Sequence, residues 1–319
     1  MPTSSAVLIS AVRTAVGRSK KGALRFMRPE AMGAAVVRAA LARAGVPDDR
    51  VEDLLIGCAF PEGPQGMNMG RVIAQRAGLP DTVAGATVNR FCSSGLQTIA
   101  MASAAIDAGH AELVVAGGAE SMSLVPMTGF YFQPDPGLVD VDPEMYISMG
   151  VTAENVSGTY GITREMQDAF ALESHRRALD AIASGRFAGE IVPLDVTEVT
   201  VEDGRRRAER TVVFDTDEGP RADTSLEALA RLRPVFRMGG SVTAGNASQT
   251  SDGAAAVVVA HADVARELGA EPLARVVSFA LAGVAPEVMG MGPVEAIQKA
   301  IARAGLKTSD IGLVELNEG

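Results

Sequence analysis

Cys92 is the residue of this chain whose type and setting point most directly to covalent chemistry. It follows a short β-type run, Ala86 to Val88, and opens a nearly uncharged run rich in Ala and Ser that continues to Gly109. This order is typical of a strand, a turn and a helix. Unpaired N–H groups and the positive end of a helix dipole favour a thiolate, which is the nucleophilic form of cysteine. Cys92 is therefore a candidate nucleophile.

The other interpretation of Cys92 is a packing residue, because free cysteine is among the most buried residue types. Ser93-Ser94-Gly95 favours the functional interpretation, since small residues let a substrate approach a helix terminus closely. Between Ser93 and Ala108 only Asp107 is charged, so we expect neighbouring elements to cover this helix on all sides. Cys58 follows a predicted buried strand and is interpreted as a packing residue.

The elements that would position Cys92 alternate between apolar strands and helices, which is typical of a layered α/β fold. The predicted strands, each a short apolar run, are residues 6–11, 51–57, 112–116 and 254–260. The predicted helices are residues 30–44, 71–77 and 163–184, with Gly45 as a C-terminal cap and Thr163 as an N-cap. Gly117-Gly118 is predicted to terminate the strand at 112–116.

From Met122 to about Gly240 the chain is richer in proline, charge and irregular segments, which predicts an inserted region that covers a site. A charged hairpin is predicted around residues 203–210. The basic residues of the region belong either to a solvated face or to an anion site; they are Arg221, Arg231, Arg233 and Arg237. The next stretch, residues 239–256, is either a connecting loop or one that offers backbone N–H groups and hydroxyls to a ligand.

An internal repeat predicts two similar halves. Residues 42–45 followed by the strand at 51–57 are matched by residues 302–305 followed by 311–317, and residues 275–280 match residues 6–11. The second copy begins near Glu271 and stops after its second strand, so we expect it to be incomplete. The predicted domains are residues 1–121 with 251–270, the insert 122–250, and the incomplete second half 271–319.

Composition excludes several classes of protein. The chain has 319 residues, with 29 basic and 39 acidic side chains and a net charge of −10, which argues against nucleic-acid binding and requires a local basic site for any anionic ligand. No run resembles a signal peptide or a membrane span. Two cysteines and three scattered histidines show no metal-ligand spacing, so we predict a cytoplasmic protein without a metal site.

Seven ordered motifs run along the chain, at residues 11–14 (AVRT), 57–66 (GCAFPEGPQG), 89–95 (NRFCSSG), 117–121 (GGAES), 150–155 (GVTAEN), 242–253 (VTAGNASQTSDG) and 315–318 (ELNE). On these motifs, the sequence resembles the thiolases over its whole length. The resemblance implies a five-layered αβαβα fold of two similar halves with an inserted loop domain. It also implies CoA-dependent acyl transfer, namely thiolytic cleavage of 3-ketoacyl-CoA or the reverse Claisen condensation. Ser148 stands where short-chain biosynthetic thiolases carry a His, so the chain looks more like the degradative 3-ketoacyl-CoA thiolases.

The resemblance also implies roles for particular residues. Cys92 would be acylated, and Asn317 would help to bind a catalytic water or the substrate carbonyl. The residues implied to contact CoA or substrate are Arg221, Phe236, Ala244, Ser248, Met149 and Met289. CoA or acyl-CoA would be a substrate rather than a permanently bound cofactor. Thiolases are usually homodimers or homotetramers, and residues 57–66 resemble a subunit-contact segment of the family.

Two further thiolase motifs, a His in Gly-His-Pro and a Cys in Cys-x-Gly-Gly-Gly, do not occur in the 319 residues. We therefore expect a C-terminally truncated thiolase that does not turn over, unless His110 or His261 supplies the missing base. One alternative is a non-catalytic acyl-CoA-binding or lipid-binding protein of thiolase type. Another is a ketoacyl synthase of the same fold, which Asn317-Glu318 and the VTAGNAS loop disfavour.

Overall fold

The computed structural model describes residues 4–202 and 206–317, which fall into two compact units. The first unit comprises three segments, Met1–Tyr131, Gly185–Gly219 and Thr250–Val277. The second unit comprises Phe132–Ser184, Pro220–Gln249 and Ser278–Gly319. Residues 185–219 therefore belong with the first unit, whereas the sequence predicts one continuous insert over 122–250.

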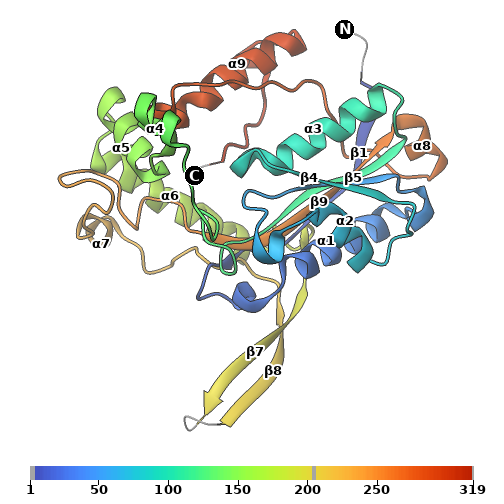
Figure 1. Cartoon of the computed structure of the whole chain (residues 1–319), viewed down its shortest axis with the longest axis horizontal. Helices are drawn as coiled ribbons and strands as arrows, with labels where there is room; N and C mark the ends of the chain where they lie inside the picture. The colour runs from blue at the N-terminus through green and yellow to red at the C-terminus, as the bar shows by residue number, and fades with distance from the viewer. Residues whose placement is uncertain (1–3, 203–205, 318–319) are drawn as a thin grey trace. The chain divides into compact units, whose positions relative to one another are not determined.

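A mixed sheet forms the centre of the first unit (Figure 1). Its strands are β1 (Ala6–Thr14), β2 (Gly17–Arg18), β3 (Asp53–Gly57), β4 (Ala84–Val88), β5 (Leu113–Ser121), β6 (Ile191–Val192), β9 (Ser251–His261) and β10 (Ala274–Arg275). The order is β10-β1-β9-β5-β3-β4, and β2 and β6 pair with β9 and β1. Because β3 is parallel to β4 and β5, and β9 is antiparallel to β5 and β1, the carboxyl ends of β1, β3, β4 and β5 meet at one edge. The predicted α/β class and the predicted strands of this sheet are confirmed.

Helices cover both faces of this sheet (Figure 1). The helices of the unit are α1 (Pro29–Ala44), α2 (Met69–Arg76), α3 (Ser94–Asp107) and α8 (Ala262–Glu267). Successive residues of a strand point to opposite faces, so Leu54 and Ile56 join the core under α1 and α2, while Leu55 joins the core under α3. Helix α1 ends at Gly45, whose φ of 63° is the left-handed conformation expected of a C-terminal cap.

The glycine pair Gly117-Gly118 does not terminate its strand, and that prediction is wrong. Strand β5 continues through both residues to Ser121. Gly117 pairs with Ala256 of β9, and a Cβ atom at Gly117 would lie 2.2 Å from the carbonyl oxygen of Ala255. The glycine therefore permits a close backbone approach inside the sheet rather than marking a turn.

Helix α3 is covered on one face only, so the expectation of cover on all sides is also wrong for this unit. Ala102 and Ile106 are buried against the sheet. Leu96 and Met101, on the other face, are 61% and 39% exposed. Burial against its own sheet therefore does not by itself explain why α3 has so few charged residues.

A long antiparallel hairpin, β7 (Leu194–Glu202) with β8 (Arg206–Phe214), projects from the first unit (Figure 1). Leu194, Val196 and Phe214 bury its base in the main core. The predicted hairpin around residues 203–210 is confirmed by the pairing of the two strands, although residues 203–205 lie outside the described part of the chain.

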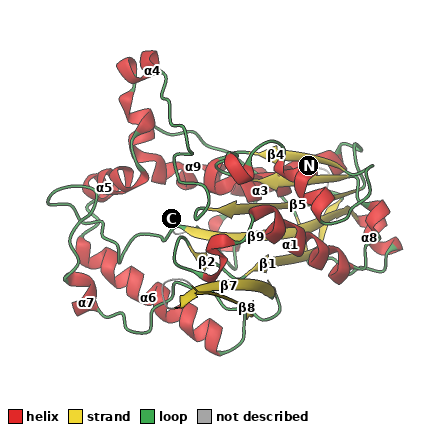
Figure 2. Ribbon diagram, turned by 60° about the horizontal axis from the view of Figure 1, so that its bottom comes forward, coloured by secondary structure: helices red, strands yellow, loops and turns green. Residues whose placement is uncertain are grey.

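The second unit is mainly helical in its described residues (Figure 2). Its helices are α4 (Pro136–Val141), α5 (Met149–Tyr160), α6 (Arg164–Ala183), α7 (Leu226–Ala230) and α9 (Gly292–Ala304). Helix α6 confirms the prediction for residues 163–184, because the Thr163 side chain accepts a hydrogen bond from the Met166 N–H.

The internal repeat is confirmed in its helix and not in its strands. Helix α9 ends at Gly305 with a φ of 71°, as α1 ends at Gly45. The predicted strand at 275–280 is reduced to β10, and residues 311–317 form no strand, so these two predictions are wrong. A strand needs a hydrogen-bonding partner, and among the described residues none pairs with 276–280 or 311–317.

Candidate active site

Cys92 lies in a single 3-10 turn, Phe91–Ser93, between the carboxyl end of β4 and the first turn of α3. Its thiol is exposed. The Ser94 hydroxyl fixes the turn by accepting a hydrogen bond from the Arg90 N–H at 2.8 Å and donating to the Phe91 carbonyl at 2.6 Å. The predicted order of strand, turn and helix is confirmed, and Cys92 lies in the turn just before a helix of 14 residues.

Close contacts with the sheet fix the start of α3. A Cβ atom on Gly57, the last residue of β3, would lie 2.6 Å from the Ser94 carbonyl carbon and 2.7 Å from the Gly95 nitrogen. The Thr98 hydroxyl lies 3.0 Å from the carbonyl oxygen of Gly117 in β5. The first turns of α3 are thus held directly against the end of β3 and the middle of β5.

The other thiol has a different environment. Cys58 is buried, and its Sγ lies 3.7 Å from a Glu120 carboxylate oxygen. Burial, reinforced by the negative charge of Glu120, raises the pKa of the Cys58 thiol to about 12. Cys58 therefore stays protonated near neutral pH, as its interpretation as a packing residue predicts, and Cys92 is the accessible thiol.

Neither histidine of the first unit lies beside Cys92. His110 follows the far end of α3, and 14 helical residues rise about 20 Å. His261 is the last residue of β9 and pairs with Ala6, at the sheet edge opposite to the one that carries Cys92. The alternative in which His110 or His261 supplies the missing base does not fit this geometry. His175, in the second unit, accepts a hydrogen bond from the Arg221 N–H.

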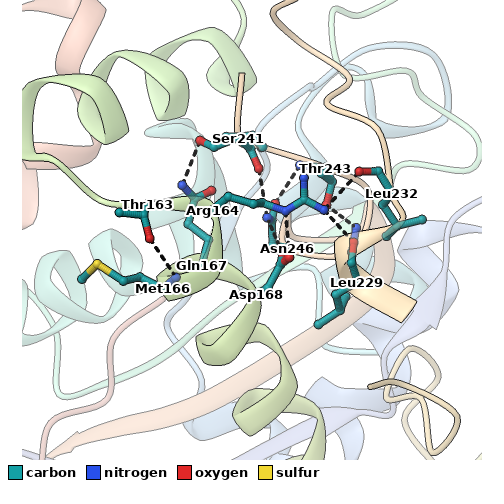
Figure 3. Close-up of polar contacts among 12 residues, drawn as sticks. Thr163, Arg164, Met166, Gln167, Asp168, Leu229, Leu232, Ser241, Thr243 and Asn246 are labelled. Atoms are coloured by element: carbon teal, nitrogen blue, oxygen red, sulfur yellow. Dashed lines mark hydrogen bonds and ion pairs between the residues drawn. The ribbon is translucent and has the colours of Figure 1, made fainter. Parts of the chain in front are cut away.

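In the second unit, a buried ionic network supports the loop that contains Ala244 and Ser248 (Figure 3). Asp168, only 4% exposed, accepts hydrogen bonds from Arg164 Nε at 2.8 Å and from Asn246 Nδ2 at 2.9 Å. Asn246 Oδ1 in turn accepts from the Thr243 N–H at 2.7 Å. The network thus connects helix α6 to both sides of the loop.

A second buried carboxylate holds the entry to the same loop. Glu154 of α5 is 4% exposed. Its Oε2 accepts a hydrogen bond of 2.9 Å from the Ser241 N–H, and its Oε1 accepts one of 2.8 Å from the Val242 N–H. The side chains of Val242 and Thr243 are buried, whereas Ala244 and Ser248 are exposed. The loop therefore has a fixed base and an accessible tip.

Three more predicted contact residues gather near α5. Met149 is the first residue of α5, and a Cβ atom on the next residue, Gly150, would overlap the ring of Phe236. Met289 lies in the turn Pro286–Met291, which is tied to α5 where Asn155 Nδ2 donates to the Glu287 carbonyl at 3.0 Å. All three side chains are 40–44% exposed.

The two remaining predicted residues of the second unit are exposed. The Arg221 guanidinium forms an ion pair of 2.8 Å with Asp223, which raises the pKa of the arginine and lowers that of the aspartate. Asn317 lies in the segment 311–317, which has no regular secondary structure.

The sequence analysis did not identify the buried side chains that support the 241–248 loop, namely Glu154, Asp168 and the amide of Asn246. Glu154 stands inside the GVTAEN motif, and Asp168 lies four residues after Arg164 on one helix face. The motif and the spacing single out these two carboxylates, but they do not indicate what the carboxylates bind. Their partners lie 78 to 88 residues away along the chain, and no local pattern points to them.

Among the described residues there is no group of three or more His, Cys, Asp or Glu side chains that could hold a metal ion. No described helix is long and apolar enough to cross a membrane.

The fold and the motifs are of thiolase type, and family models of both thiolase domains match the chain. The family model described as "Thiolase, N-terminal domain" matches residues 6–263, and the model described as "Thiolase, C-terminal domain" matches residues 270–319. The first of these covers most of the chain. The chain belongs to the thiolase family.

Named relatives agree with this assignment. The chain is 52% identical to a 3-ketoacyl-CoA thiolase of Bacillus subtilis (strain 168) and 45% identical to an acetyl-CoA acetyltransferase of Escherichia coli (strain K12). Each alignment covers 98% of this chain and 80% of the relative. The crystal structure of the Bacillus anthracis acetyl-CoA acetyltransferase matches with a TM-score of 0.86 and 41% identity, over 99% of this chain and 80% of that one. These matches do not support the expectation of a C-terminally truncated chain, and they leave the expected incomplete second half unconfirmed.

Proposed function

We propose that this protein is a CoA-dependent acyltransferase that cleaves 3-ketoacyl-CoA to acetyl-CoA and a shortened acyl-CoA, or runs the reverse condensation, through an acyl-Cys92 intermediate. The observation that carries the proposal is the exposed thiol of Cys92 at the start of α3, within a chain that belongs to the thiolase family. The buried thiol of Cys58 offers no competing nucleophile near neutral pH.

The reaction follows from thiol chemistry. The Cys92 thiolate attacks the 3-keto carbon, and the C2–C3 bond breaks with its electron pair moving to C2 of the leaving acetyl-CoA, which takes up a proton. The remaining acyl group is then a thioester of Cys92. The thiolate of a second CoA attacks this thioester and releases the cysteine together with the shortened acyl-CoA. The proton lost by that CoA balances the one taken up at C2.

We propose that CoA and the acyl chain contact Arg221, Phe236, Ala244, Ser248, Met149 and Met289, and that Asn317 assists at the substrate carbonyl. The exposed tip of the 241–248 loop and the arginine charge support this part, because CoA phosphates need cations and N–H donors in a protein of net charge −10. The five-layered arrangement, the predicted domain limits and the homodimeric or homotetrameric assembly remain predictions. So does the absence of a permanently bound cofactor, as does the cytoplasmic location.

We further propose that these 319 residues by themselves do not complete the catalytic cycle, although Cys92 can still take up an acyl group. Proton transfer to C2 and from CoA needs an acid or base within hydrogen-bonding distance of each atom. Such a group typically raises the reaction rate by about a hundred- to ten-thousand-fold. The sequence contains neither the Gly-His-Pro nor the Cys-x-Gly-Gly-Gly motif, and His110 and His261 lie far from Cys92.

Intact-mass measurement after incubation with acetyl-CoA or a 3-ketoacyl-CoA tests the proposal. We expect the wild-type chain to gain one acyl group, Cys92→Ser to gain none, and the matched control Cys58→Ser to behave as wild type. Acylation at Cys58 would remove Cys92 from its role.

The missing motifs favour one second candidate, a non-catalytic acyl-CoA-binding protein. Titration calorimetry with CoA and intact-mass measurement together separate the two, because that candidate predicts binding without acylation of Cys92. In either case Arg221→Ala should weaken CoA binding and reduce its dependence on salt. Unchanged affinity would exclude Arg221 from the site.

A further inference from the structure

The residue before the candidate nucleophile has an unusual backbone conformation. Phe91 has a φ of +46°, in the left-handed region that a bulky residue rarely adopts. This conformation turns the chain from the end of β4 into the 3-10 turn that presents Cys92. A conformation of this kind persists only where the surrounding structure holds it.

Asn89 supplies that restraint. Its Oδ1 accepts a hydrogen bond of 2.9 Å from the Phe91 N–H, and its Nδ2 donates one of 2.9 Å to the carbonyl oxygen of Ala59. The Phe91 ring also lies against Phe60, with 6.0 Å between ring centroids. One amide thus connects the loop after β3 to the residue that orients Cys92.

The loop that Asn89 holds on to is itself rigidly supported. The Glu120 carboxylate accepts hydrogen bonds from the Ala59 N–H and from Gln65 Nε2, both at 2.6 Å. Gln65 is fully buried, and its Oε1 accepts from the Ser121 N–H. Glu120 and Ser121 end strand β5, so the support for Asn89 is anchored in the sheet.

We propose that Asn89 is a positioning residue for Cys92. On the proposed function, on which this inference rests, Asn89 does not touch the substrate. It acts through Phe91, whose strained conformation sets the 3-10 turn that presents Cys92 at the start of α3. Without the amide, water competes for the Phe91 N–H and the turn relaxes, so Cys92 spends less time at the helix terminus, a position typical of reactive cysteines.

The test is the rate at which iodoacetamide alkylates Cys92 at pH 7, followed by mass spectrometry. Asn89→Ala should slow alkylation about two- to five-fold, the factor expected when a charge loses its place at a helix terminus. Adding Phe91→Gly to Asn89→Ala should restore the rate, because glycine adopts a left-handed φ without a restraint. A purely structural loss of the Ala59 contact would not be rescued in this way.

Asn68→Ala is the matched control. The Asn68 side chain likewise accepts from a backbone N–H, that of Arg71, and donates to a backbone carbonyl, that of Gly85. It should cost similar stability and leave the Cys92 rate unchanged. A wild-type rate in Asn89→Ala, a double variant as slow as the single one, or equal slowing in Asn68→Ala would overturn the proposal.

Two further measurements test the role of Asn89 if the variants do not fold or if the proposed function is wrong. If Asn89→Ala does not fold, hydrogen exchange of the wild-type protein applies, because the Phe91 amide should be protected although the residue is 62% exposed. Rapid exchange there would overturn the role of Asn89. Alkylation needs no CoA, so if acetyl-CoA fails to acylate Cys92, the proposed function fails while the alkylation series still decides the role of Asn89.

Discussion

Gly57→Ala should displace the helix terminus that carries Cys92. The added Cβ would meet the Ser94 carbonyl carbon at 2.6 Å and the Gly95 nitrogen at 2.7 Å, whereas ordinary contacts begin at 3.4 Å. The start of α3 must therefore retreat from β3 by about 0.8 Å, the difference between 3.4 and 2.6 Å. Both opposing atoms belong to the backbone, so no side chain can rotate to relieve the overlap.

The displacement has two measurable costs. Overpacking of this kind lowers the free energy of unfolding by about 1–3 kcal/mol, which urea denaturation followed by circular dichroism would detect. A displacement of about 1 Å at a reacting group can cost about a hundred-fold in rate, so acylation of Cys92 by acetyl-CoA should fall more steeply than stability. Intact-mass measurement over time gives that rate.

Gly95→Ala is the control for the added methyl group. Gly95 is the second residue of α3, and a Cβ atom there meets nothing within 4 Å. Because alanine favours a helix more than glycine does, this variant should be as stable as wild type or more so. If Gly57→Ala proved as stable and as readily acylated as wild type, the close contact between β3 and α3 would not be what fixes the nucleophile.

Three further predictions concern other parts of the chain. Burial raises the pKa of Cys58 to about 12, so iodoacetamide at pH 8 should label the folded chain once, at Cys92, and double labelling on peptide mapping would contradict the structure. Asp168→Ala removes the carboxylate partner of the Arg164 guanidinium and should destabilise the second unit by about 3–5 kcal/mol, with loss of amide protection around Asn246; unchanged hydrogen exchange in the 241–248 loop would show that Asp168 does not support this loop. Hydrogen bonds from two arginines lower the pKa of Glu173 from 4.5 to about 2, so its stabilising effect should be complete above pH 4.5 and disappear as the pH falls toward 2; an NMR titration that gave an ordinary carboxyl pKa would disprove the pairing.

Local signals in the sequence were sufficient for most elements of the sheet and for the setting of Cys92. Helix α1 with Gly45 and helix α6 with Thr163 were predictable, because caps depend on residues next to the helix end. The same holds for Cys92, whose place between a strand and a helix follows from the periodicity on either side. The seven motifs together also indicated the family.

Interactions between distant residues decided the rest. The local sequence at Gly117 predicts the end of a strand, whereas pairing with the backbone of β9 makes this residue part of β5. The predicted strands at 275–280 and 311–317 have suitable sequences, but a strand forms only where another strand offers hydrogen bonds, and beyond Arg275 none does among the described residues. Asn89 meets the Ala59 carbonyl 30 residues away, a contact that periodicity and capping rules do not contain. The sequence by itself thus determined which residue is the nucleophile candidate, while the tertiary structure decided what holds it, because burial and strand pairing depend on residues that only folding brings together.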